Sequence, residues 1–85
     1  MFINKTIDGK NNICGAVVAA QRKQLGISQR ELADELQRIG LDVDKNAIQR
    51  IEAGLRFVTD IELCYISRAL HVSIDTLLAE YLRLP

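Results

Sequence analysis

The sequence predicts an all-α fold, in which one small domain is built from five short helices. The 85 residues include a single proline, at the last position, so little interrupts helix formation. Apolar residues recur at the spacing of helical faces along most of the chain. Ser28, Thr59 and Ser73 each stand just before such a segment, where helices start. With 48% hydrophobic residues, the chain can bury one core.

The chain is expected to divide into a polar N-terminal arm, residues 1–12, and a helical domain, residues 13–85. The first helix of that domain is predicted over residues 13–25, and Gly26 ends it. Helical periodicity selects one face of this helix as the buried one. The residues expected on that face are Ile13, Val17, Ala20 and Gln24.

The second helix begins with a capping box. The Ser28 hydroxyl can accept a hydrogen bond from the Glu31 backbone N–H, and the Glu31 carboxylate can reach back to the Ser28 N–H. Gly40 then breaks the helical pattern. The residues expected on the buried edge of this helix are Leu32, Ala33, Leu36 and Ile39.

A third helix is predicted over residues 45–53, with Asp44 as its N-cap and Gly54 as its stop. Ile48 and Ile51 share its buried face. The outer face carries two amides and an arginine where Glu and Lys are usual: Asn46, Gln49 and Arg50. Such a face is either simply solvated or suited to contact the edges of DNA bases.

Two further helices complete the domain. Thr59 and Glu62 form a second capping box and open a fourth helix that extends to about Leu70. Its expected apolar face is Ile61, Cys64, Tyr65, Ile66, Ala69 and Leu70. Ser73 caps a fifth helix. The apolar residues assigned to that helix are Ile74, Leu77, Leu78, Tyr81, Leu82 and Leu84.

Side chains that could support catalysis or bind a metal are few and scattered. Cys14 and Cys64 fall on predicted apolar faces and are expected to be small buried hydrophobes. His71, the single histidine, has no second ligand at metal-site spacing and falls where the fourth helix ends. There is no glycine-rich phosphate loop, and Ser28 and Ser73 are accounted for as helix caps. An enzyme, a metal and a cofactor are therefore not expected.

Charge and hydropathy restrict the partners only weakly. The 11 basic and 11 acidic residues cancel, which is poor support for a nucleic-acid-binding protein. Basic residues exceed acidic ones by one over residues 21–56, whereas acidic residues exceed basic ones by two from residue 57 onward. This distribution permits a basic face without demonstrating one. No apolar run is long enough to cross a bilayer, and residues 1–12 lack the apolar centre of a signal peptide, so we expect a cytoplasmic protein.

The second and third helices together resemble a helix-turn-helix. Ala33 would let the two helices approach closely, although helix pairs of this kind also occur in proteins that never bind DNA. The spaced motifs are more specific. Arg22, followed by LGISQRELA at 25–33, IQRIEAG at 48–54 and ALHVSIDTLL at 69–78, resembles the xenobiotic-response-element (XRE) family of DNA-binding transcriptional regulators, which are related to the phage lambda repressor and Cro. The resemblance covers residues 13–78.

The sequence departs from the family pattern between the second and third helices. About five extra residues fall there, around 37–41. We expect them to lengthen the second helix and widen the turn, with Ile39 or Leu41 packing into the core. This insertion leaves open how deeply, and at what angle, the third helix enters a DNA groove.

The resemblance implies which residues contact DNA. Lys45, Asn46 and Arg50 match positions that commonly contact base edges in this family. Arg is suited to guanine O6 and N7, and Asn to adenine N6 and N7. Ala47 could contact a thymine methyl group, and Gln49 is a neighbouring candidate.

The resemblance also implies contacts to the phosphates and one internal ion pair. Gln29 matches a position that contacts phosphate or supports base contacts, at a helix N-terminus that itself attracts anions. Arg56, after the third helix, is placed for a backbone phosphate. Arg22 and Glu52 match a pair that in this family joins the first helix to the end of the third, so they are assigned a structural role.

Each proposed base contact has an ordinary alternative. Lys45 could be solvated, and Asn46 could satisfy backbone groups at the helix start. Arg50 could pair locally with Asp44 or Glu52, a contact usually worth only about 0.2–0.5 kcal/mol.

Two functions remain open from the sequence. The first is a sequence-specific transcriptional regulator of prokaryotic or phage type, expected to be a repressor, that binds double-stranded operator DNA as a homodimer with half-sites about 34–36 Å apart. Its dimer surface could be the fifth helix, unless Tyr81, Leu82 and Leu84 cover their own core. The alternative is a protein-interaction module, antitoxin-like, with weak or no DNA binding. The neutral charge and the insertion favour this alternative.

Overall fold

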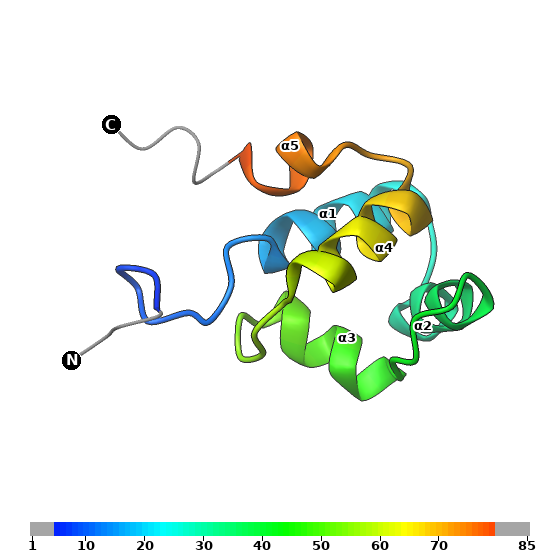
Figure 1. Ribbon diagram of the computed structural model, residues 1–85, viewed down its shortest axis with the longest axis horizontal. Coiled ribbons are helices and arrows are strands. Elements are labelled where there is room, and N and C mark those ends of the chain that lie inside the picture. Colours follow the sequence, from blue (N-terminus) through cyan, green and yellow to red (C-terminus); the bar gives the residue numbers. More distant parts are fainter. Residues whose placement is uncertain (1–4, 80–85) are drawn as a thin grey trace.

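The computed structural model describes residues 5–79 and places five helices among them (Figure 1). In chain order they are α1 (Gly15–Gln24), α2 (Gln29–Arg38), α3 (Lys45–Glu52), α4 (Asp60–Leu70) and α5 (Ile74–Leu77). The described residues contain no strand, and the predicted all-α fold is confirmed. None of the described helices is long and apolar enough to cross a membrane.

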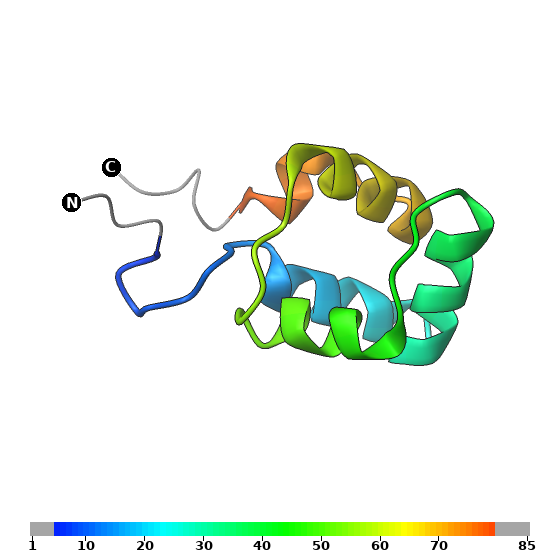
Figure 2. The same cartoon turned by 60° about the horizontal axis from the view of Figure 1, so that its bottom comes forward.

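The helices enclose one core. α3 packs against α2 and α1, and α4 packs against α1, α2 and α5. In Figure 2, α1 and α3 lie along one side of the bundle and α4 along the other. The buried apolar residues are Cys14, Val18, Leu32, Ala33, Leu36, Val43, Ile48, Ile51, Ile66, Ala69, Leu70 and Leu77.

Local capping sets four of the helix starts as predicted. In each case a side-chain oxygen accepts a hydrogen bond, of 2.8–3.1 Å, from the backbone N–H three residues further on. The residues that provide this oxygen are Ser28, Asp44, Thr59 and Ser73. Because such hydrogen bonds satisfy N–H groups that have no partner within the helix, they define where each helix begins.

The buried face of α1 differs from the predicted one. Ala20 and Gln24 are exposed, and Ile13 and Val17 are only partly buried. The buried residues of α1 are Gly15, Val18 and Arg22. The prediction was wrong because hydrophobic periodicity gives no weight to a glycine or to an arginine, which here pack against α3.

The helices α1 and α3 are in close contact at Gly15. A Cβ atom at this position would lie 2.2 Å from the carbonyl oxygen of Ile51 and 3.2 Å from that of Glu52. Backbone atoms cannot move away as a flexible side chain can. The absence of a side chain at Gly15 therefore sets how closely the two helices approach.

The outer face of α4 also differs from the prediction. Ile66, Ala69 and Leu70 are buried as expected, but Ile61 is 65% exposed and Cys64 is exposed. The prediction that both cysteines are buried holds only for Cys14, which is 2% exposed and whose thiol pKa is raised by that burial. The prediction failed for Cys64 because, within residues 5–79, the packing of α1, α2 and α5 against α4 leaves this residue exposed.

The link between α2 and α3, residues 39–44, contributes to the core. Ile39 and Leu41 pack partly buried against the core, as expected, and Val43 is buried at 5% exposure. The Gln37 side-chain amide donates a hydrogen bond of 2.7 Å to the Val43 carbonyl oxygen. Of the extra residues around 37–41, the first two end α2 and the others belong to a link that packs against the core.

The C-terminal end is described as far as residue 79. Leu77 is buried, while Ile74 and Leu78 are partly buried. The other residues assigned to the fifth helix, and to a dimer surface on it, lie outside the described part of the chain: Tyr81, Leu82 and Leu84.

We predict that Gly15→Ala lowers the free energy of unfolding by about 1–3 kcal/mol, because the added methyl group forces α1 away from α3. Urea denaturation followed by circular dichroism measures this difference. The neighbouring exposed Ala16→Ser serves as the control and should have little effect. Equal stability of Gly15→Ala and the unmodified protein would show that the two helices separate freely.

Candidate nucleic-acid interface

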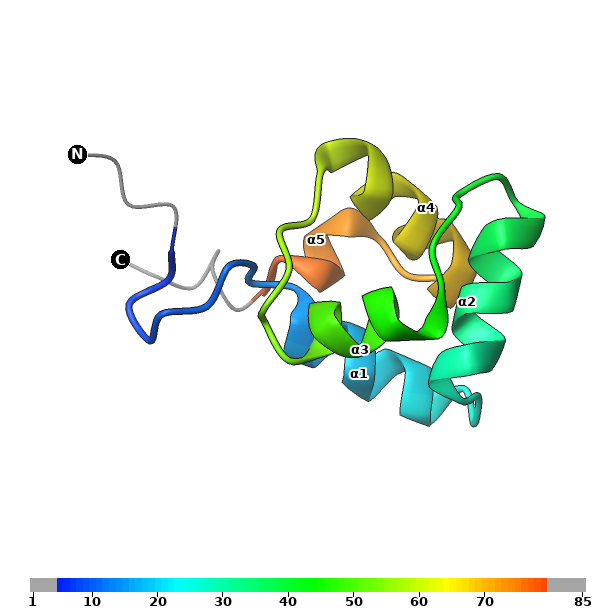
Figure 3. The ribbon, with the colours of Figure 1, turned by 90° about the horizontal axis from the view of Figure 1, so that it is seen from below.

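Helix α3 lies at one face of the molecule, in front of α1 in Figure 3. Ile48 and Ile51 fix it to the core at 0% and 1% exposure. Ala47 is partly buried between the core and the surface. The exposed residues of α3 include four of those predicted to contact DNA: Lys45, Asn46, Gln49 and Arg50.

The local partners considered for Arg50 are engaged elsewhere. The Asp44 carboxylate accepts the Ala47 N–H at 2.8 Å as the N-cap of α3, and Glu52 is paired with Arg22. Within residues 5–79, no ion pair involves Arg50 or Lys45. Both cationic groups are therefore available to a ligand outside the domain.

The predicted pair of Arg22 and Glu52 is present and nearly buried. Arg22 Nε donates to Glu52 Oε2 at 2.7 Å, and Nη2 donates to Oε1 at 3.0 Å, with side-chain exposures of 10% and 8%. The third nitrogen, Nη1, donates to the Ile27 carbonyl oxygen at 2.9 Å. Hydrogen bonding to Glu52 raises the pKa of Arg22. These contacts join α1 to the end of α3 and to the end of the α1–α2 turn.

Gln29 is turned toward this ion pair. Its side-chain Nε2 donates a hydrogen bond of 3.0 Å to Glu52 Oε1, and the residue is partly buried. Glu52 thus accepts from both α1 and the first residue of α2. Gln29 holds the N-terminus of α2 close to α3, and one N–H group of its side-chain amide is engaged in that contact.

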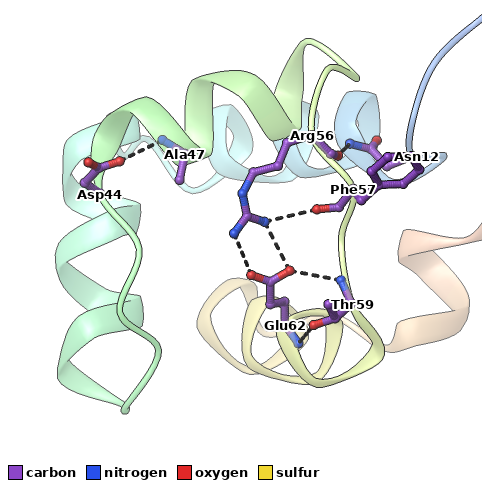
Figure 4. A network of polar contacts seen from close by, with 7 residues as sticks. All are labelled: Asn12, Asp44, Ala47, Arg56, Phe57, Thr59 and Glu62. Carbon is purple, nitrogen blue, oxygen red and sulfur yellow. Dashed lines mark hydrogen bonds and ion pairs between the residues drawn. The ribbon is translucent and has the colours of Figure 1, made fainter.

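Arg56, predicted to contact phosphate, is paired with groups of the protein itself. Its Nη2 and Nη1 donate to the Glu62 carboxylate at 2.8 and 3.1 Å, and Nη1 also donates to the Phe57 carbonyl oxygen at 3.1 Å (Figure 4). The hydrogen bonds from Arg56 lower the pKa of Glu62. Glu62 also completes the capping box with Thr59. Arg56 therefore ties the α3–α4 link to the first turn of α4.

Sequence reasoning did not identify Asn12. Its side-chain nitrogen donates to the Ile51 carbonyl at 3.0 Å and to the Arg56 carbonyl at 2.8 Å, while its oxygen accepts the Gly15 N–H at 2.8 Å. One amide thus satisfies groups at the end of α3 and at the start of α1. An asparagine before a helix is a recognisable cap, but its partners 39 and 44 positions away are not visible in the sequence.

Arg30 is a second residue that sequence reasoning did not single out. It is exposed in the first turn of α2 and lines, together with Lys45, a shallow groove between α2 and α3. Two aspartates, Asp34 and Asp44, line the same groove. A cation such as Arg30 in the first turn of a helix interacts unfavourably with the helix dipole. This unusual placement is the sequence feature that points to an anion bound from outside.

Comparison with known proteins agrees with this geometry. Residues 18–77 match the helix-turn-helix family. The match covers most of the chain, so the protein belongs to this family of XRE-type, lambda repressor-like DNA-binding transcriptional regulators, as its motifs predicted.

A solved structure confirms the fold. The restriction-modification controller protein C.AhdI from Aeromonas hydrophila superimposes with a TM-score of 0.66 and 23% sequence identity, over 75% of this chain and 86% of that chain. A comparison with curated protein sequences gave no match.

Breaking the buried ion pair should unfold the protein before it alters any binding. We predict that Glu52→Gln lowers the free energy of unfolding by about 3–5 kcal/mol, because Arg22 is left buried without its counter-charge. Urea denaturation at neutral pH measures the loss. Arg38→Ala, which breaks the exposed pair with Glu35, is the control and should leave stability nearly unchanged. A small effect of both variants would contradict the structural role.

The pair of Arg56 and Glu62 should make stability depend on acid. Because the pKa of Glu62 is lowered in the folded protein, its contribution is complete above its ordinary value of 4.5 and is lost as the pH falls through the lowered value. In Glu62→Gln the amide keeps the capping box but not the ion pair.

We therefore predict that the unmodified protein is more stable than Glu62→Gln at neutral pH, and that this difference shrinks as the pH falls below the ordinary value of 4.5 and through the lowered pKa of Glu62. Urea denaturation at a series of pH values tests this. A difference that stays constant on acidification would contradict the assignment.

Proposed function

We propose that the protein is a transcriptional repressor that binds operator DNA as a two-fold homodimer, with α3 in the major groove. The observation that carries the proposal is the outer face of α3. Its cationic groups form no ion pair within residues 5–79, while the helix itself is held by Arg22, Glu52 and Asn12. A helix fixed from behind with free polar groups in front is suited to direct contact with bases.

The proposed base contacts follow from the chemistry of the side chains. Arg50 can donate two hydrogen bonds to guanine O6 and N7, and Asn46 can pair with adenine N6 and N7. Ala47 offers a methyl group to thymine, and Lys45 and Gln49 flank these positions. We propose Arg50 as the principal specificity residue.

The proposed phosphate contacts lie beside α3. The N-terminus of α2 presents N–H groups that favour an anion, and Gln29 and Arg30 stand in its first turn. Because Arg56 is paired with Glu62, its proposed role is more limited. It positions the α3–α4 link, and it contacts phosphate only when that pair opens.

The short recognition helix supports the dimer. α3 has eight residues and can contact only a few base pairs, so useful affinity requires two copies. A formal net charge of zero also limits the contribution of phosphate attraction. A dimer that covers its operator excludes other proteins from that DNA, which makes repression the proposed outcome.

A second candidate function is a protein-interaction module with weak or no DNA binding. It is favoured by the neutral charge and by three exposed large apolar residues near the α3–α4 link: Leu55, Phe57 and Ile61. Such residues on a small domain can mark a protein contact.

Selection on a random duplex library at near-physiological salt tests the first function. We expect a two-fold motif, and we expect Arg50→Ala to relax one base position in each half-site at a cost of about 1–3 kcal/mol. Arg38→Ala is the matched control, because Arg38 is an exposed arginine at the far end of α2, and it should enrich the same motif. If the folded protein enriches no sequence, the DNA-binding proposal is overturned and a protein partner is favoured.

A further inference from the structure

Helix α4 carries an exposed stripe whose residues suit a second copy of the same helix. The stripe consists of Asp60, Ile61, Cys64 and Arg68, all exposed, while the opposite side of α4 is buried in the core. Ile61, at 65% exposure, is a large apolar side chain left in water. Within residues 5–79, α1, α2 and α5 pack against α4 and leave this stripe exposed.

The charges on the stripe are complementary to themselves. Asp60 and Arg68 stand four residues before and four residues after Cys64. If two copies of α4 pack antiparallel with Cys64 at their centre, Asp60 of one copy lies opposite the partner's Arg68, and the symmetry repeats the contact. Neither residue forms an ion pair within residues 5–79. The helix dipoles also oppose one another in this arrangement.

The apolar residues of the stripe fit the same arrangement. Cys64 is small and would let the two helix axes approach closely at the crossing point. Ile61 lies one turn before it, so each Ile61 would cover the partner's Cys64. Burial of Ile61 would remove the largest apolar exposure on α4 from water.

The position of α4 is compatible with two copies bound to one DNA. In Figure 3, which looks onto α3, α4 lies at the edge of that face rather than behind it. A two-fold axis that runs through this edge, perpendicular to the face, turns both α3 helices toward the same side. The two α3 helices then lie on the outer parts of the pair, as two half-sites require.

We propose that a second copy of this chain docks antiparallel on α4, centred on Cys64 and held by Asp60 and Arg68. This inference rests on the proposed function and names the surface through which that dimer forms. We infer a second copy as the partner from the charges. The stripe has one acidic and one basic end, and an antiparallel second copy places a basic end against the acidic one and an acidic end against the basic one.

A charge-swap series tests the proposal by sedimentation equilibrium of the full chain. Asp60→Arg and Arg68→Asp alone should each raise the dimer dissociation constant by about tenfold or more, because each places two like-charge contacts in the interface. The double variant Asp60→Arg/Arg68→Asp restores opposite charges and should recover most of the affinity. Asp75→Arg and Lys23→Asp reverse exposed charges elsewhere and should have no such effect. Circular dichroism verifies that each variant is folded.

Cross-linking tests the register. A short bis-maleimide should join two copies through Cys64, and Cys64→Ser should abolish the product. Cys14→Ser should not, because Cys14 is 2% exposed and cannot react in the folded protein. Asp60→Arg should reduce the cross-linked fraction and the charge-swapped double variant should recover it.

The possible results separate this inference from the proposed function. Single reversals that leave dimerisation unchanged, a double variant that does not recover, or a dimer that fails to cross-link at Cys64 would each overturn the α4 interface, even if a two-fold DNA motif is enriched. A protein that is monomeric with and without DNA would overturn it as well, whereas enrichment of a single half-site would still support DNA binding by α3. Dimerisation through α4 without any enriched DNA would support the interface and overturn the DNA-binding proposal.

Discussion

The ion pair between Arg22 and Glu52 is the interaction on which the arrangement of the helices depends. It lies where the end of α1, the first residue of α2 and the end of α3 meet, and both carboxylate oxygens of Glu52 accept hydrogen bonds. Burying two charges is expensive, and only close geometry with additional hydrogen bonds offsets that penalty. Here the guanidinium forms two bonds to the carboxylate and a third to the Ile27 carbonyl oxygen. These hydrogen bonds therefore fix the positions of the three helices relative to one another.

A second set of contacts holds the C-terminal end of α3. Gly15 lets α1 approach the backbone of α3, and Asn12 binds carbonyl groups at the end of α3 and in the link that follows. The buried face of α3 is thereby committed to packing. Its outer face carries little of the stability, so residues such as Asn46 and Arg50 are free to be selected for a ligand rather than for the fold. This separation is what allows one scaffold to recognise different partners.

The surfaces of α3 and α4 differ in charge and have different proposed roles. A chain with no net charge gains little from general attraction to DNA, so the proposed function depends on a few directed contacts and on the proposed joining of two copies. The exposed cations on α3 fit the first requirement. The α4 stripe, with its opposed charges about Cys64, fits the second. The neighbouring Arg56, although basic, is held by Glu62 and shows that a cation near α3 can serve the fold instead.

The sequence by itself determined the class of fold, the starts of α2 to α5 and the exposure of Lys45, Asn46, Gln49 and Arg50. These features depend on caps three residues apart and on periodicity within one helix, which are local. The pairing of Arg22 with Glu52 was accessible only through the family motif, because the two residues are 30 positions apart. Tertiary structure alone decided that Gly15 is buried, that Ile61 and Cys64 are exposed, and that Gln29 and Arg56 are bound to glutamates. Which face of a helix is covered depends on the neighbours that pack against it, and no local pattern contains that information.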